Sequence, residues 1–107
     1  MPSEHDRRIL QRFKTLMAER QVPLCQTILF GSRARGDARA DSDYDVLVVV
    51  ERLDPRVRRT ISDCAWEAGF DEALVVVTVP VARLDFESGL FSQSLLAQAI
   101  RQEGVVV

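Results

Sequence analysis

The stretch TILFGSRARGDARADSDYDVLVVV, residues 27–50, decides the fold of this chain. Its short apolar run at 27–30 predicts a buried strand that ends at Gly31. Its second apolar run has no alternation, so a strand at 44–51 should be covered on both faces. The polar, glycine-punctuated residues 31–43 predict a loop with one helical turn. Two successive strands joined by a long polar loop indicate an α+β fold with a mixed β-sheet rather than a doubly wound parallel one.

Apolar residues at helical spacing lie on both sides of this stretch and predict helices that flank the sheet. The expected elements, in the order α-β-β-α-β-α with a further short strand, are a helix at 4–21, strands at 27–30 and 44–51, a helix at 55–69, a strand at 74–79, a helix at 92–103 and a strand at 105–107. Ser3 and Asp54 are suited to cap the first two helices. Pro80 cannot donate to a sheet ladder, so the strand before it, again buried on both faces, should end there or lie at an edge. The apolar residues expected to face inward from the last helix are Phe91, Leu95, Leu96, Ala99 and Ile100.

Length and charge exclude several classes of protein. The 107 residues fit a single domain, 1–107. A net charge of −2 argues against a nucleic-acid coat or a membrane-surface protein, because both need a positive excess. The N-terminal residues MPSEHDRRIL carry no apolar signal-peptide core, and no apolar run approaches the roughly 20 residues that span a bilayer. We therefore expect a cytoplasmic protein with no membrane and no nucleic acid as partner.

Two carboxylates stand at the mouth of the second strand. Asp43 and Asp45 are two residues apart, so their side chains should point to the same face. Two such charges repel, and a cation between them would relieve the repulsion. Mg²⁺ fits, because it is typically held by one or two carboxylates together with phosphate oxygens. The alternative cation is an arginine, and Arg33, Arg35 and Arg39 are all near in sequence.

The turn after the first strand has the composition of a phosphate-binding turn. Gly31 lets a backbone approach a phosphate closely, and Ser32 offers a hydroxyl beside the N–H groups of the turn. If the two strands are neighbours, a triphosphate could lie between them with the metal bridging its oxygens. Arg35 has two open interpretations: it binds phosphate, or it holds the loop by pairing with Asp37 or Asp43.

The remaining polar and aromatic residues have structural interpretations. Arg33 and Arg39 are expected to be solvated charges of the loop. Tyr44 alternates to the face opposite the aspartates, so it should pack in the core. Trp66 falls between the apolar positions of its helix, so half-burial and a place on an interaction surface stay equally open.

The run GSRARGDARADSDYDVLVVV resembles the signature of the DNA polymerase β-like nucleotidyltransferase superfamily: Gly-Ser, ten residues, Asp-x-Asp and a hydrophobic strand. The nearest resemblance is to the minimal nucleotidyltransferase (MNT) branch, whose short proteins are often paired with HEPN-domain partners in toxin–antitoxin modules. It implies a mixed sheet flanked by helices and a site for a nucleoside triphosphate such as ATP. It also implies Asp43 and Asp45 as catalytic and Mg²⁺-binding carboxylates, and Gly31 and Ser32 as nucleotide-binding residues. Arg35 is a further candidate nucleotide-binding residue, on the first of its two interpretations above.

One departure from the family pattern concerns a third carboxylate. Active members usually carry it on the strand that follows the second helix, where this sequence has LVVVTV. Asp71 and Glu72 precede that strand and could serve if it begins earlier. Two functions therefore stay open: transfer of a nucleoside monophosphate to an acceptor hydroxyl, for example on a partner protein, and a non-catalytic MNT-type antitoxin that acts by contact. The protein partner would be a HEPN-domain protein or a second copy of the chain.

Overall fold

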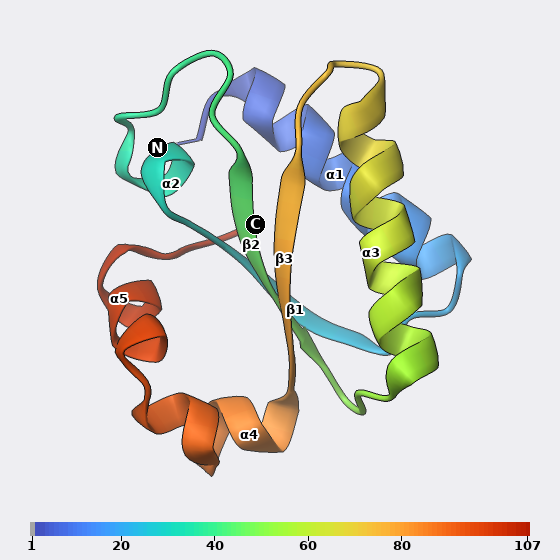
Figure 1. Cartoon of the computed structure of the whole chain (residues 1–107), viewed down its shortest axis with the longest axis vertical. Helices are drawn as coiled ribbons and strands as arrows, with labels where there is room; N and C mark the ends of the chain where they lie inside the picture. The colour runs from blue at the N-terminus through green and yellow to red at the C-terminus, as the bar shows by residue number, and fades with distance from the viewer. Residues whose placement is uncertain (1) are drawn as a thin grey trace.

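The computed structural model describes residues 2–107, which form a four-stranded mixed sheet with helices on both faces (Figure 1). Its elements are α1 (Glu4–Glu19), β1 (Leu24–Phe30), α2 (Ser32–Arg35), β2 (Tyr44–Val50), α3 (Pro55–Phe70), β3 (Val76–Ala82), α4 (Arg83–Ser88), the 3₁₀ turn η1 (Leu90–Gln93), α5 (Leu95–Glu103) and β4 (Val105–Val106). The predicted fold class, a mixed sheet flanked by helices, is confirmed.

The strands lie in the order β3-β2-β1-β4. β1 runs antiparallel to both of its neighbours, β2 and β4, whereas β2 and β3 are parallel. The parallel pair needs a crossover, and α3 supplies it. The two strands predicted to flank the polar loop are therefore direct neighbours, which is the condition that the predicted site requires.

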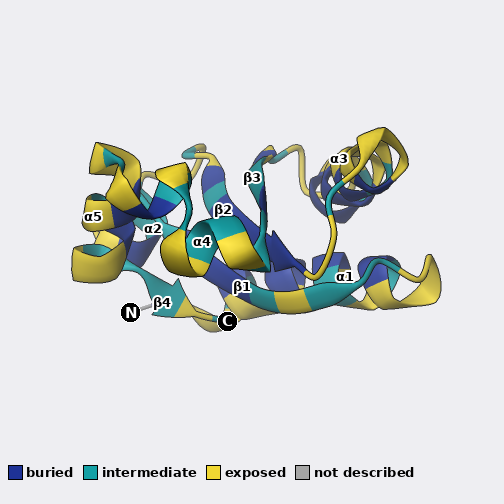
Figure 2. Cartoon of the chain, turned by 90° about the horizontal axis from the view of Figure 1, so that it is seen from below, coloured by how far each residue is buried: buried dark blue, intermediate teal, exposed yellow. Residues whose placement is uncertain are grey.

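Two apolar clusters cover the two faces of the sheet. The larger one packs α1 and α3 against side chains that include Leu29, Tyr44, Val46 and Val48. The smaller one packs α5, with α4 and η1, against residues that include Leu47. Figure 1 shows the same division, with α1 and α3 on one side of the strands and α4 and α5 on the other. Seen from below and coloured by burial, β2 is mostly dark, β3 is largely of intermediate burial, and the outer helix faces are exposed (Figure 2). Both faces of β2 are covered, as its unbroken apolar run predicts.

The starts of α1 and α3 follow the capping signals in the sequence. Ser3 caps α1, and Asp6 completes a capping box by accepting the Ser3 N–H at 3.0 Å. Asp54 caps α3 by accepting the Val57 N–H at 2.8 Å, with Pro55 at the first helical position.

The structure differs from the sequence-based predictions at the third strand and the last helix. β3 starts at Val76 and continues through Pro80, which pairs with Val48, because an outer strand tolerates a proline. The face of β3 that carries Val77 is covered only toward its far end, since Val77 is 40% exposed whereas Val81 is 4% exposed. The last helix begins three residues later than predicted, at Leu95, which is 83% exposed and does not face inward. Ile100 is buried as predicted, and the other buried residue of this helix is Ala97.

No helix formed by residues 2–107 combines the length and apolar character that crossing a membrane requires.

Candidate functional site

The register of β1 on β2 brings the turn and the carboxylates together. Phe30 pairs with Asp45 in the antiparallel ladder, so Gly31, one residue on, begins its turn beside the start of β2. The predicted turn residue Ser32 begins α2, a single helical turn that ends at Gly36. The loop predicted at 31–43 therefore contains the one helical turn expected of it.

Gly31 lies directly against the Asp45 carboxylate. A Cβ on Gly31 would collide with Asp45 Oδ2 and would stand 3.2 Å from Asp45 Cγ. The Gly31 backbone has φ 74° and ψ −159°, a region that only glycine adopts readily. Glycine is thus needed twice at this position, for the backbone conformation and for the space that the carboxylate occupies.

Asp43 and Asp45 form a pair of neighbouring acids. Burial raises the pKa of Asp45 above its usual value and the nearby charge of Asp43 raises it further, while the charge of Arg35 offsets part of this rise. Among the ion pairs formed by residues 2–107, none involves Asp43 or Asp45. The arginine alternative from the sequence is therefore not realised here. The donor set, two neighbouring carboxylates without a partner, fits a hard divalent cation.

Arg35 pairs with acids rather than standing free. Its Nε contacts Asp37 Oδ2 at 3.3 Å, and its Nη1 contacts Glu103 Oε2 at 3.2 Å. Of the two partners proposed from the sequence, Asp37 is correct and Asp43 is not. Glu103, at the end of α5, also accepts the Gly31 N–H at 3.2 Å. The sequence gives no signal for this residue, because only the fold brings α5 to the turn.

Arg33 was expected to be a solvated charge, and that expectation is wrong. Its side chain is 10% exposed, and Nη1 lies 3.3 Å from Asp6 Oδ1. Its Nη2 donates to the carbonyl oxygens of Ser42 at 2.7 Å and Ala40 at 3.2 Å, while the guanidinium stacks 4.3 Å from the centre of the Tyr44 ring. Arg33 therefore closes the loop that leads into Asp43.

Asp6 anchors this arrangement from α1. Its Oδ1 accepts the Tyr44 hydroxyl at 2.6 Å, and Tyr44 is fully buried, as its alternation predicts. Burial raises the pKa of Asp6, but the hydrogen bonds from Tyr44 and Ser3 and the charge of Arg33 outweigh it, so the net pKa is lowered. A residue that the sequence marks only as part of a capping box thus also fixes the site loop.

The third carboxylate does not come from the residues that the sequence offered. Asp71 is the C-cap of α3. Glu72 Oε2 lies 3.9 Å from His5 Nε2 of α1, the helix that packs on the same face of the sheet as Tyr44. The residue of β3 that pairs with Asp45 is Val77. Within residues 2–107, no three or more His, Cys, Asp or Glu side chains are grouped to hold a metal ion.

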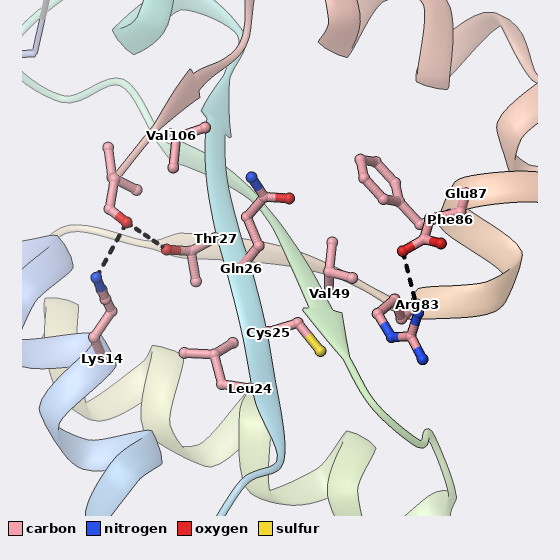
Figure 3. A pocket seen from close by; sticks show the side chains of 11 residues that line it. Lys14, Leu24, Cys25, Gln26, Thr27, Val49, Arg83, Phe86, Glu87 and Val106 are labelled. Carbon is pink, nitrogen blue, oxygen red and sulfur yellow. Dashed lines mark hydrogen bonds and ion pairs between the residues drawn. The ribbon is translucent and has the colours of Figure 1, made fainter.

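A separate pocket of about 430 Å³ lies beside the other end of β1 (Figure 3). Its lining includes Lys14, Cys25 and Arg83, and none of the predicted site residues contributes to it. Cys25 is exposed there, with its Sγ 3.1 Å from Glu51 Oε1.

Comparison with known families assigns the chain to a class of protein, the nucleotidyltransferases. The model of the nucleotidyltransferase domain matches residues 8–105, so the chain belongs to this family. A search of the curated proteins gave no match.

Solved structures share the fold. A toxin–antitoxin crystal structure with AMP-PNP has a TM-score of 0.64 at 22% identity, covering 90% of this chain and 69% of that one. A mutant of the toxin–antitoxin MntA–HpeT has a TM-score of 0.62 at 23% identity, covering 92% and 70%. A putative nucleotidyltransferase from Sulfolobus solfataricus has a TM-score of 0.54 at 19% identity, covering 94% and 82%.

Proposed function

We propose that the chain binds a nucleoside triphosphate, ATP in the first instance, together with Mg²⁺. It transfers the nucleoside monophosphate to a hydroxyl of a partner protein: the hydroxyl oxygen, losing its proton, bonds to the α-phosphorus as the bond to the β-phosphate breaks, and pyrophosphate leaves. The observation that carries the proposal is the contact between Gly31 and Asp45. This contact supports the proposal because the turn lies beside two neighbouring carboxylates that form no ion pair within residues 2–107. Membership of the nucleotidyltransferase family supports it.

Each residue has a separate task in this proposal. The Gly31 N–H and the Ser32 hydroxyl donate to phosphate oxygens, and Arg35 offsets phosphate charge. Asp43 and Asp45 would hold Mg²⁺, which would neutralise charge on the triphosphate oxygens during transfer. Arg33 and the residues that bind it keep the loop in place, so the two carboxylates meet the turn without rearrangement.

Calorimetry with and without the metal tests the carboxylates. ATP should bind in the presence of Mg²⁺ and bind at least tenfold more weakly with EDTA, a loss of about 1.4 kcal/mol or more. Asp43→Asn should weaken Mg²⁺-dependent binding by a similar factor. It should leave the thermal stability unchanged or higher, because a repulsion between neighbouring acids is relieved. Equal ATP affinity in EDTA and in Mg²⁺ would remove the metal from the proposal.

A second function is favoured by two observations on β3 and α3. Val77 occupies the position beside Asp45 where a third carboxylate would lie. Trp66 is 65% exposed and stacks on Phe70 with ring centres 4.6 Å apart, next to a pocket of about 440 Å³ that Val75 also lines. An antitoxin-like subunit that acts by contact, on a HEPN-domain partner or on a second copy of the chain, would use such an apolar face.

Labelled ATP distinguishes the two functions. The chain would be incubated with α-labelled ATP, Mg²⁺ and the protein that co-purifies with it. Label on the partner that disappears with Asp45→Asn supports transfer. Stable binding of the partner without label supports the contact function, which Trp66→Ala should then weaken.

A further inference from the structure

Glu103 satisfies the groups that the proposed function assigns to phosphate. Its Oε1 accepts the Gly31 N–H at 3.2 Å, and its carboxylate lies 3.2 and 3.3 Å from Arg35 Nη1. One donor is a backbone N–H of the turn, and the other is a guanidinium. These are the groups that bind a phosphate oxygen, and a carboxylate is the protein's own anion of similar charge and geometry.

The sheet fixes the position of this carboxylate. β4 pairs with β1 through Leu29 with Val105 and Ile28 with Val106. Continued in the same register, this pairing sets Glu103 opposite Gly31. The chain end beyond β4 is tied down as well, because Lys14 Nζ and Thr27 Oγ1 donate to the Val107 carbonyl oxygen at 3.1 and 2.9 Å (Figure 3). The pairing of β4 with β1 therefore holds Glu103 beside Gly31.

The hydrogen bonds of Glu103 argue against a role for this residue as a metal ligand. Its two oxygens are already turned to N–H donors. No group of three metal-ligating side chains forms in the described part of the chain, although Asp43, Asp45 and Glu103 all lie in this region. The charge of Glu103 instead adds to the acidic surroundings of Asp45.

We infer that Glu103 is an internal competitor for the triphosphate: its carboxylate occupies the phosphate position at Gly31 and Arg35, and a nucleotide binds only after displacing it. The inference rests on the proposed function, since it concerns the same turn. The Glu103 side chain is 26% exposed and that of Arg35 is 47% exposed, so the contact is solvent-accessible enough to be broken. The consequence is a nucleotide affinity set lower than the turn alone would give.

The test compares Glu103→Gln with the wild-type chain in calorimetric titrations of Mg²⁺ and AMP-PNP. Glutamine keeps the size and the acceptor oxygen but loses the charge that binds Arg35 and repels the triphosphate. The Kd should therefore fall by about threefold or more, the range expected for an accessible ion pair. Asp37→Asn is the matched control, because Asp37 also pairs with Arg35 but makes no contact with Gly31; its Kd should change less.

The outcomes separate the inference from the function that it deepens. An unchanged Kd in Glu103→Gln, with normal binding by the wild-type chain, overturns the inference and leaves the proposed function standing. A higher Kd in Glu103→Gln, together with a smaller effect of Mg²⁺ on binding, also overturns the inference and makes Glu103 a ligand of the metal. If neither the wild-type chain nor Glu103→Gln binds AMP-PNP, both proposals fail.

Discussion

Gly31→Ala should abolish detectable triphosphate binding, with a loss of affinity of about a hundredfold or more, equivalent to roughly 2.8 kcal/mol. Two separate causes add. The Gly31 backbone lies in a region that costs other residues on the order of 1–3 kcal/mol. The new methyl group would also meet Asp45 Oδ2, so the carboxylate must leave the position that faces the turn. The measurement is calorimetric titration of Mg²⁺ and AMP-PNP, with thermal unfolding to show that the variant is folded.

Gly36→Ala provides the matched control for backbone strain. Gly36 has φ 88° at the end of α2, so alanine there is strained by about 1–2 kcal/mol, but the residue is exposed. This variant should lose stability and keep its nucleotide affinity. If Gly36→Ala weakens binding as much as Gly31→Ala, the loss would come from strain in the loop rather than from the displaced Asp45 carboxylate.

Asp6→Asn should lower the free energy of unfolding at neutral pH by about 3 kcal/mol, because it leaves Arg33 buried without its counter-charge. For a chain of this size that loss corresponds to a fall in Tm of roughly 12 °C or more. Chemical unfolding monitored by the fluorescence of the single tryptophan would measure it.

The effect of Asp6→Asn on stability should depend on pH in a definite direction. The pKa of Asp6 is lowered in the folded chain, so its ionised form stabilises the fold above the pKa of the unfolded chain. That contribution is lost as the pH falls through the lowered folded value. The wild-type chain and Asp6→Asn should therefore differ most at neutral pH and converge in strong acid. Tyr44→Phe removes the 2.6 Å hydrogen bond but keeps the ion pair, so it should cost less. A difference that does not narrow in acid would show that the Asp6 charge is not the cause.

The sequence predicts the elements of this site better than the contacts between them. Gly31, Asp43 and Asp45 are identified by local rules, since a glycine after a strand and two acids in alternation constrain only their immediate neighbours. From the sequence alone, the two strands could only be assumed to be neighbours, whereas the structure shows β1 paired with β2. Glu103 could not be found in this way, because its place depends on a two-residue strand far along the chain.

The burial of Arg33 could not be predicted from the composition of its segment. It lies in a run of small and charged residues, which usually means a solvated loop. Its burial depends on a tyrosine ring and on an acid from α1, both distant in sequence. The outward turn of Leu95 has a simpler cause. Leu95 is five residues from Ile100, which at about 100° per residue places the two side chains about 140° apart around the helix. Burial of Ala97 and Ile100 therefore leaves Leu95 outside, and apolar spacing alone does not decide which of the two faces packs.

The outer position of β3 has a consequence for the behaviour of the protein at high concentration. The segment 74–79, LVVVTV, joins strong β-propensity to a complete lack of charge, the composition that promotes cross-β aggregation when a strand edge is open. In the sheet formed by residues 2–107, β3 pairs with a strand on one side only, and Pro80 lies within it. A second chain adding to this edge would find no N–H donor at Pro80, so the ladder could not continue past it. Pro80 therefore limits the length of the ladder that a second chain could form on this edge.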